Sequence, residues 1–215
     1  RHILHIELIL GHQSCSPADP AIDADCGGRM SDSRTSLPVI SAAVLVALAG
    51  AYYVSDFRTD DAYITLRYAK HWASGAGLVW NPGEAPVEGY SNFLHLVIAR
   101  LGIEVGVSPF ALLRGFNIAS LLTLIALLPA LARRAGASEG PATAITLLVA
   151  AHAPMTYWTV SGLETASHAL LALISILGVW SEDPRRRLGG ALALLLLGLS
   201  RPEGPVLAVI LALAW

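Results

Sequence analysis

The stretch LPVISAAVLVALAGAYYV, which runs from Leu37 to Val54, contains no charged side chain. Its length is close to the ~20 apolar residues that a helix needs to cross a bilayer. Arg34 precedes it, and positive charge before a first span favours a cytoplasmic start. We therefore interpret this stretch as a membrane-spanning helix.

The rest of the chain has the composition of an integral membrane protein. Apolar residues make up 54% of the 215 residues, charged residues make up 14%, and the mean hydropathy is +0.59. Soluble domains are about a quarter charged, so this chain has too little polar surface to cover a water-exposed core. The net charge of −2 says nothing about nucleic acid, but the sequence has no basic domain and no alternation of aromatic and basic residues, so we expect no nucleic-acid partner. We predict an all-α fold, a polytopic bundle of transmembrane helices.

The two ends of the chain differ from its middle. Residues 1–29 have a mixed composition without periodicity, and the polar stretch MSDSRTS begins at Met30. We interpret residues 1–29 as a disordered or artefactual extension and residues 30–215 as the membrane domain. Because the final run PVLAVILALAW has no polar flank, we expect this domain to be the N-terminal part of a longer one.

Further apolar stretches are candidate spans: Pro109–Ala132, Pro141–Trp158, Thr165–Trp180, Leu188–Leu199 and the residues from Pro205 onward. The stretch Asn92–Ile103 contains His95 and Arg100, which are costly at mid-membrane, and we interpret it as an interfacial helix. This choice leaves Arg133, Arg134 and the run Arg185–Arg187 on the cytoplasmic side, as the positive-inside rule prefers. The outer loop of residues 55–108 and the turns TVSGLET and SRPEG then share the outer face.

The outer loop carries the residues that we expect to act on a substrate. It reads FRTDDAYITLRYAKHWASGAGLVWNPGEAPVEGY over residues 57–90. Thr59 is a candidate N-cap of a helix that reaches about Ser74, and Asp60 and Asp61 fall in its first turn. Acids there complement the helix dipole and contribute about 0.3–1 kcal/mol each, so capping is the alternative to a catalytic role.

The spacing within this helix gives it a polar and an apolar side. Asp60, Arg67, His71 and Ser74 recur at helical intervals on one face, and small and aliphatic residues form a stripe on another. We therefore expect the helix to lie on the membrane surface with its polar side in water.

Acidic residues recur in the two other outer turns, as Glu164 in SGLET and as Glu203 beside Arg201 in SRPEG. The transfer of a sugar from a polyprenyl-phosphate carrier to a hydroxyl group needs a base for the acceptor proton, and a carboxylate is suitable. It also needs a cation for the departing phosphate, which an arginine can bind through two N–H groups. The lipid tail of the donor restricts such a site to a membrane boundary.

The motifs TDDAYITLRYAKHWASGAGLVWNPGEAPVEGYSNFL, SGLET and LSRPEG resemble, in this order, the GT-C superfamily of polytopic glycosyltransferases that use lipid-linked sugars. The resemblance covers about residues 37–215 and is nearest to bacterial enzymes similar to terminal arabinofuranosyltransferases. It implies juxtamembrane helices, a polyprenyl-phosphate sugar as donor and an inverting transfer to a glycan, lipid or protein of the cell envelope. It also implies a catalytic aspartate in the first outer loop, at the outer face of the bacterial plasma membrane. Some members use a divalent metal, and the sequence does not decide this point.

These considerations assign a role to each polar residue. We expect Asp60 or Asp61 to be the general base, and Asp60 is favoured because it shares a face with Arg67 and His71. Arg201, together with Arg67, is expected to bind the donor phosphate. Five residues are expected to shape the sugar pocket or to face it: Asn81, Glu88, Tyr90, Glu164 and Glu203. Structural alternatives stay open, such as lipid headgroup contacts for Arg67 and interfacial anchoring for Tyr90.

Two other classes of protein are alternatives. A transporter or lipid flippase places ionisable groups inside its spans or breaks its helices near the midplane, whereas the acids here lie in loops. A non-enzymatic membrane scaffold accounts for the spans but not for the long polar loop.

Overall fold

The computed structural model describes residues 36–179 and 181–213, and this part of the chain consists of nine α-helices without a strand. The all-α prediction is therefore confirmed, whereas the interpretation of residues 1–29 lies outside the described residues. The helices are α3 (Ser36–Tyr53), α4 (Asp60–Ala73), α5 (Phe93–Glu104), α6 (Pro109–Arg134), α7 (Glu139–Ala150), α8 (Ala153–Val160), α9 (Thr165–Val179), α10 (Pro184–Ser200) and α11 (Gly204–Leu213).

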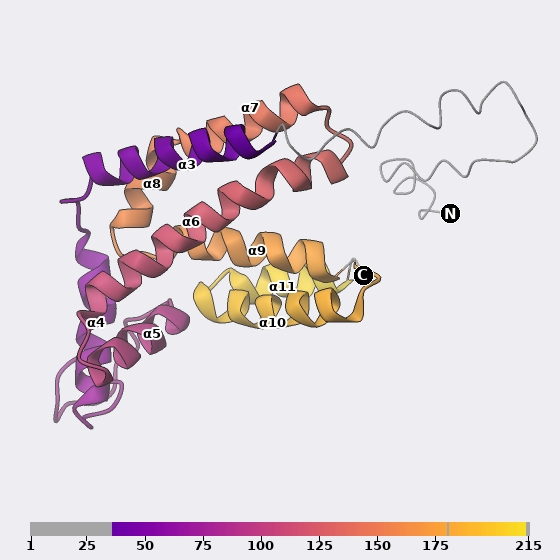
Figure 1. Cartoon of the computed structure of the whole chain (residues 1–215). Coiled ribbons are helices and arrows are strands. Elements are labelled where there is room, and N and C mark those ends of the chain that lie inside the picture. Colours follow the sequence, from indigo (N-terminus) through magenta and orange to yellow (C-terminus); the bar gives the residue numbers. More distant parts are fainter. Residues whose placement is uncertain (1–35, 180, 214–215) are drawn as a thin grey trace, which may run out of the picture.

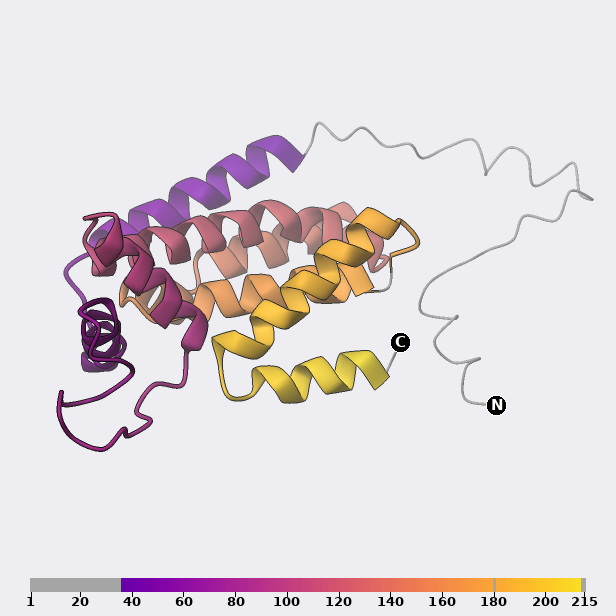
Figure 2. The same cartoon turned by 90° about the horizontal axis from the view of Figure 1, so that it is seen from below.

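Most of the helices run along one common direction, and α4 crosses their end. Figure 1 shows α3, α6, α7, α9, α10 and α11 side by side, with α4 roughly at right angles to them. In the perpendicular view α4 is seen end-on (Figure 2). The outer loop, the α8–α9 turn and the α10–α11 turn lie at this same end of the bundle (Figure 1). The chain therefore gathers the three polar segments that we identified in the sequence.

Helix α6 connects the two apolar cores. In the middle of the bundle, Leu121 and Ile125 of α6 pack with Ala43 and Ala47 of α3 in one buried cluster. Nearer its N-terminus, Leu113 packs with buried residues of the outer-loop helices, namely Tyr68 and Ala69 of α4 and Leu96 and Ala99 of α5. Small residues on α3 allow the backbones to approach closely, as at helix interfaces in membranes. The outer loop is thus a packed structure that is continuous with the bundle.

Residues 141–158 do not form the single span that we expected. Helix α7 ends at Ala150 and α8 begins at Ala153, with His152 as its N-cap. Pro154 has no N–H group to donate to the carbonyl of Ala150, so a continuous helix would lose a hydrogen bond there. The His152 ring supplies a cap instead, because the Met155 N–H donates to its Nδ1 over 3.2 Å. The prediction of one helix over this stretch was wrong for this local reason.

Within the described residues, α6 alone is a single helix with both the length and the apolar character of a membrane span. Its apolar segment covers Pro109–Arg133 with a mean hydropathy of 1.9. Helices α8 and α9 meet these criteria only as a pair, which is bent by 111°. The helices Leu37–Tyr53 and Glu139–Ala150 are apolar but shorter. The helical fold is therefore established, and the number of spans remains a prediction.

Two glycines determine how closely α9 and α10 pack. A methyl group on Gly190 would lie 2.6 Å from the Cα atom of Gly178, whereas one on the neighbouring Gly189 would have nothing within 4 Å. Helix α10 can therefore contact α9 backbone to backbone only because neither position carries a side chain.

We predict that Gly190→Ala destabilises the protein by about 1–3 kcal/mol, because the added methyl group forces the two helices apart. Gly189→Ala is the matched control and should be neutral or stabilising by up to about 1 kcal/mol, since alanine favours a helix. Unfolding of the detergent-solubilised protein, followed by circular dichroism, measures both. Equal stability of the two variants would contradict the close contact.

Candidate functional site

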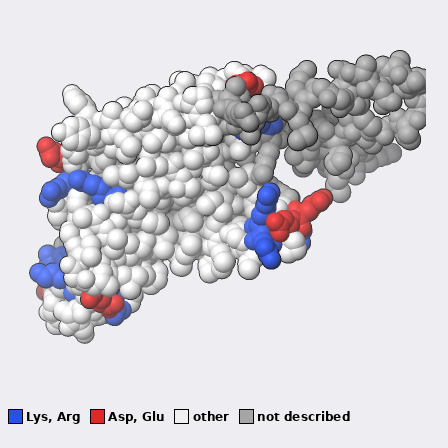
Figure 3. Space-filling view, in the orientation of Figure 1, with Lys and Arg blue, Asp and Glu red and all other residues white. Residues whose placement is uncertain are grey.

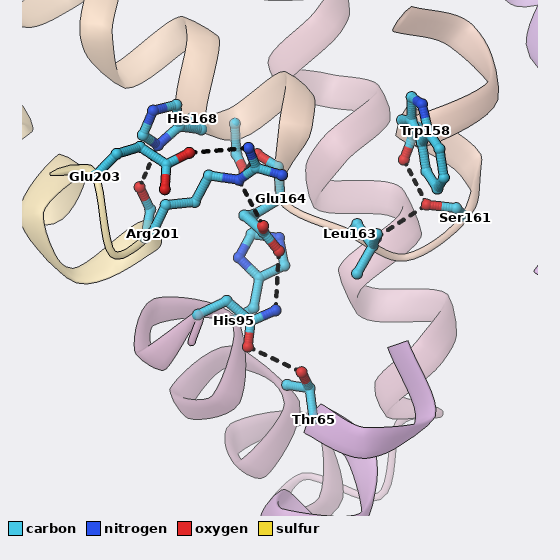
Figure 4. Close-up of polar contacts among 12 residues, drawn as sticks. Thr65, His95, Trp158, Ser161, Leu163, Glu164, His168, Arg201 and Glu203 are labelled. Carbon is cyan, nitrogen blue, oxygen red and sulfur yellow. Dashed lines mark hydrogen bonds and ion pairs between the residues drawn. The ribbon is translucent and has the colours of Figure 1, made fainter. Parts of the chain in front are cut away.

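Glu164, in the turn between α8 and α9, is the centre of a polar network at the end of the bundle. Its Oε1 accepts a hydrogen bond from Arg201 Nε over 2.7 Å, and its Oε2 accepts one from Asn92 Nδ2 over 2.9 Å. The Oδ1 of Asn92 in turn accepts from the Thr65 hydroxyl over 2.9 Å. Figure 4 shows these contacts together with that of Glu203, whose Oε1 lies 3.1 Å from Arg201 Nη1. The network joins α4, the start of α5, the α8–α9 turn and the end of α10.

Glu164 and Arg201 form an ion pair in which both side chains are ionised. The side chain of Glu164 is only 7% exposed, and that of Arg201 is 34% exposed. Burial raises the pKa of Glu164, but the hydrogen bonds from Asn92 and Arg201 outweigh this effect and lower it below the ordinary value of 4.5. Burial likewise lowers the pKa of Arg201, and its bonds to Glu164 outweigh that effect and raise it. The carboxylate therefore fixes a permanent cation at the edge of the buried region.

A cavity of about 580 Å³ lies beside Arg201. Its lining combines the Arg201 guanidinium with Glu88 and Tyr90 of the outer loop and with apolar residues such as Phe93 and Leu199. Burial, followed by the charge of Glu88, raises the pKa of Tyr90, so its hydroxyl stays protonated and can donate a hydrogen bond. The cavity thus offers a cation, a carboxylate and a hydroxyl to a ligand that also has an apolar part.

The turn that carries Glu164 is shaped by glycine and serine. Gly162 has a φ of +94°, and a methyl group there would lie 2.9 Å from Phe110 and 3.2 Å from Ala62 of α4. The Ser161 hydroxyl donates to the Trp158 carbonyl over 2.7 Å and accepts from the Leu163 N–H over 3.2 Å (Figure 4). These contacts explain why the sequence SGLE closes tightly against α4.

The two adjacent aspartates lie on different sides of α4. Asp60 lines a groove with Arg67 and His71, as the helical spacing predicted. Asp61 is one helical turn before the buried Thr65, on the side of α4 that meets the polar network. Helix α4 begins at Asp60, but the N-cap Thr59 makes no side-chain cap hydrogen bond.

Arg67 is engaged with the outer loop rather than with the Arg201 cavity. Its Nε donates to the Trp80 carbonyl over 2.9 Å, and its Nη2 donates to Asn81 Oδ1 over 2.7 Å. Asn81 is itself bonded to Glu84, with 2.8 Å between Nδ2 and Oε2. Arg67 and Asn81 therefore fix the turn after α4, and they do not line the cavity that contains Arg201, Glu88 and Tyr90.

Several residues of the network had no role assigned from the sequence. Asn92 and Thr65 connect the outer loop to Glu164, and the buried His95 lies beside them. The amide of Asn117 donates from Nδ2 to His95 Nε2 over 3.2 Å, while His95 Nδ1 and Asn117 Oδ1 have no hydrogen-bond partner among the described residues. One signal in the sequence could have identified Asn92. Asparagine is a favoured N-cap residue, and Asn92 directly precedes an apolar helix.

The described residues contain no group of three or more His, Cys, Asp or Glu side chains that could hold a metal ion. No protein-family model, curated protein or solved structure matches the chain. The family resemblance stated above therefore remains a prediction from the sequence motifs.

We predict that Glu164 makes the stability of the protein depend on pH. Because the pKa of Glu164 is lower in the folded state, its contribution is complete above the ordinary value of 4.5 and is lost as the pH falls through the folded-state pKa. Glu164→Gln should lower the stability at pH 7 and weaken the loss of stability below pH ~4.5. Unfolding midpoints between about pH 3 and pH 7 measure this effect.

Glu104→Gln is the matched control for this measurement. Glu104 pairs with Arg100 at 2.8 Å, but their side chains are 43% and 33% exposed, so the pair contributes little. The same acid dependence in wild type and Glu164→Gln would show that Glu164 is not the linked group.

Proposed function

We propose that the protein transfers a sugar from a polyprenyl-phosphate donor to a hydroxyl group at the outer boundary of a membrane. The observation that supports this proposal best is the position of Arg201. Its guanidinium is fixed by the buried Glu164 and lines a cavity with Glu88 and Tyr90, at the end of an otherwise apolar bundle. A cation in such a place suits the phosphate of a ligand whose remainder is a lipid.

The distribution of charge supports a bundle that spans the membrane. On the face shown in Figure 3, acidic and basic side chains gather at two ends, and the surface between them is uncharged. Helix α3 has 18 residues and α10 has 17, which corresponds to roughly 26 Å each and is near the ~30 Å of a bilayer core. Arg133 and Arg185–Arg187 lie at the end opposite the outer loop, as the positive-inside rule requires of a cytoplasmic end. In this placement α4 is a juxtamembrane helix.

The proposed reaction is an inverting displacement at the anomeric carbon. The acceptor oxygen forms a bond to this carbon as the bond to the phosphate oxygen breaks, and the proton of the acceptor passes to a carboxylate. Arg201 stabilises the negative charge on the departing lipid phosphate. Glu88 and the protonated Tyr90 hydroxyl bind hydroxyl groups of the sugar. Glu164 is fully engaged with Arg201 and Asn92, so it positions Arg201 rather than taking the proton.

We assign the base to Asp61 rather than to Asp60. Asp61 lies on the network side of α4, one turn from Thr65, whereas Asp60 lines the separate groove with Arg67. A carboxylate in this position can serve as the general base for the acceptor proton. The contact of Ala62 with the Gly162 turn keeps this part of α4 beside the Glu164 network.

A transporter or lipid flippase is the second candidate function. The buried His95 and Asn117, with one unpaired polar atom each, are the observation that favours it, because polar groups within a helical bundle can line a path. The proposal of a transferase is favoured because the charged groups of the network lie in turns at one end of the bundle.

The test is transfer from a synthetic polyprenyl-phosphate sugar by the detergent-solubilised chain, with release of polyprenyl phosphate as the readout. We predict that Asp61→Asn lowers the rate by roughly 10²–10⁴ without loss of folding, because it removes the base and keeps the shape. Asp60→Asn is the matched control and should lose less than tenfold. Arg201→Lys should impair donor use, since it keeps the charge but not the planar fork.

Full activity of both aspartate variants would refute the assignment of a base on α4. Transport of the lipid-linked sugar without its cleavage would favour the second candidate. A larger loss of transfer rate for Asp60→Asn than for Asp61→Asn would show that Asp60, in the groove beside Arg67, is the base.

A further inference from the structure

We propose that the groove along α4 that is lined by Asp60, Arg67 and Trp80 binds the phosphate group of an anionic membrane phospholipid, at a site separate from the Arg201 cavity. The groove has a volume of about 590 Å³. Its cationic half contains Arg67 and Lys70, with His71 beside them, and its apolar half includes Tyr63 and Ile64. The cationic half suits the phosphate group of a phospholipid, and the apolar half suits the start of its acyl chains.

The cationic half is formed by one turn of helix. Arg67 and Lys70 are three residues apart, so they lie on the same side of α4, and both are exposed. Lys70 is the only lysine among 14 basic residues of the chain. A lysine ammonium is a compact charge with three N–H donors, which suits a phosphate group that approaches from the membrane.

The charge of Arg67 is fixed in place before a ligand binds. The guanidinium lies 4.2 Å from the ring centroid of Trp80 and donates to the Trp80 carbonyl and to Asn81. These hydrogen bonds use Nε and Nη2 of Arg67, so Nη1 makes no hydrogen bond to the turn. His71 donates from Nδ1 to the Val79 carbonyl over 2.9 Å and secures the same turn. A ligand therefore meets one cation, Arg67, that needs little ordering.

The placement of the groove favours a lipid phosphate over a free phosphate. Helix α4 crosses the end of the bundle, so its length runs parallel to the membrane surface if the bundle spans the membrane (Figures 1 and 2). Ile64 and Tyr63 then form an apolar wall next to the cations, which a lipid can cover and a free anion cannot use.

The negative charge of Asp60 repels an anion in this groove, so a variant without this charge tests the proposal. It is seven residues from Arg67 and ten from Lys70, or roughly 10 Å and 15 Å along the helix. Removal of its charge should strengthen phosphate binding at the cationic half. Asp61 lies next to it in the chain but does not line the groove, so Asp61→Asn controls for a general change in surface charge.

This inference rests on the membrane placement proposed above, not on the transfer reaction. The chain is reconstituted in nanodiscs of phosphatidylcholine, with or without phosphatidylglycerol, and acetylation of the single lysine is followed by mass spectrometry. We expect phosphatidylglycerol to slow the acetylation of Lys70 about fivefold, the effect of roughly one lysine–headgroup contact. Asp60→Asn should increase this protection, and Asp61→Asn should not.

The other outcomes overturn the proposal. Equal acetylation in both lipids would show that no anionic lipid occupies the groove. Protection of the detergent-solubilised chain by millimolar inorganic phosphate would show a free-anion site. Equal effects of the two aspartate variants would show a general charge effect. Because no sugar donor is present, none of these results depends on whether the protein is a transferase.

Discussion

The ion pair between Glu164 and Arg201 is the interaction on which the polar end of the molecule depends. A buried carboxylate is costly unless charged and polar groups compensate it, and here the partners come from segments far apart in the chain. Asn92 is 72 residues from Glu164, and Arg201 is 37 residues from it. One side chain thus fixes the outer loop to the α8–α9 turn and fixes the end of α10 to both.

The molecule has two regions with different physical origins. The bundle is assembled by close packing of small and aliphatic residues, as at Gly178 and Gly190, and it has an uncharged middle (Figure 3). The end that carries α4 and α5 is assembled by polar contacts and aromatic packing, for example around Tyr68. Helix α6 belongs to both regions. The proposed transfer from a lipid-linked donor uses both regions, the apolar bundle for the lipid and the polar end for the phosphate and the sugar.

Local patterns predicted much of this structure, and contacts between distant segments account for what they missed. The candidate N-cap Thr59 predicted that α4 begins at Asp60. Periodicity predicted that Asp60 and His71 share one face, because helical spacing is a local property. The sequence also predicted that Glu164 and Arg201 share one end of the bundle. It could not show that Arg67 binds the turn after α4 rather than the Arg201 cavity, since this depends on the path of a loop.

The predicted membrane spans likewise agree with the structure only in part. An apolar stretch predicted one helix over residues 141–158, but the missing N–H of Pro154 and the ring of His152 divide it in two. This division explains why α7 is too short to be a candidate span by length, whereas α6 is a candidate among the described residues.

A double-mutant cycle on Glu164→Gln and Arg201→Gln tests the central claim most directly. Each single variant removes one charge of this ion pair and leaves the opposite charge buried or half-buried without it, so each should be clearly destabilised. The double variant should be more stable than the sum of the two losses predicts, with a coupling of roughly 1–3 kcal/mol from unfolding of the detergent-solubilised chain. Additive losses would contradict the account, because they would show that the two side chains do not depend on each other.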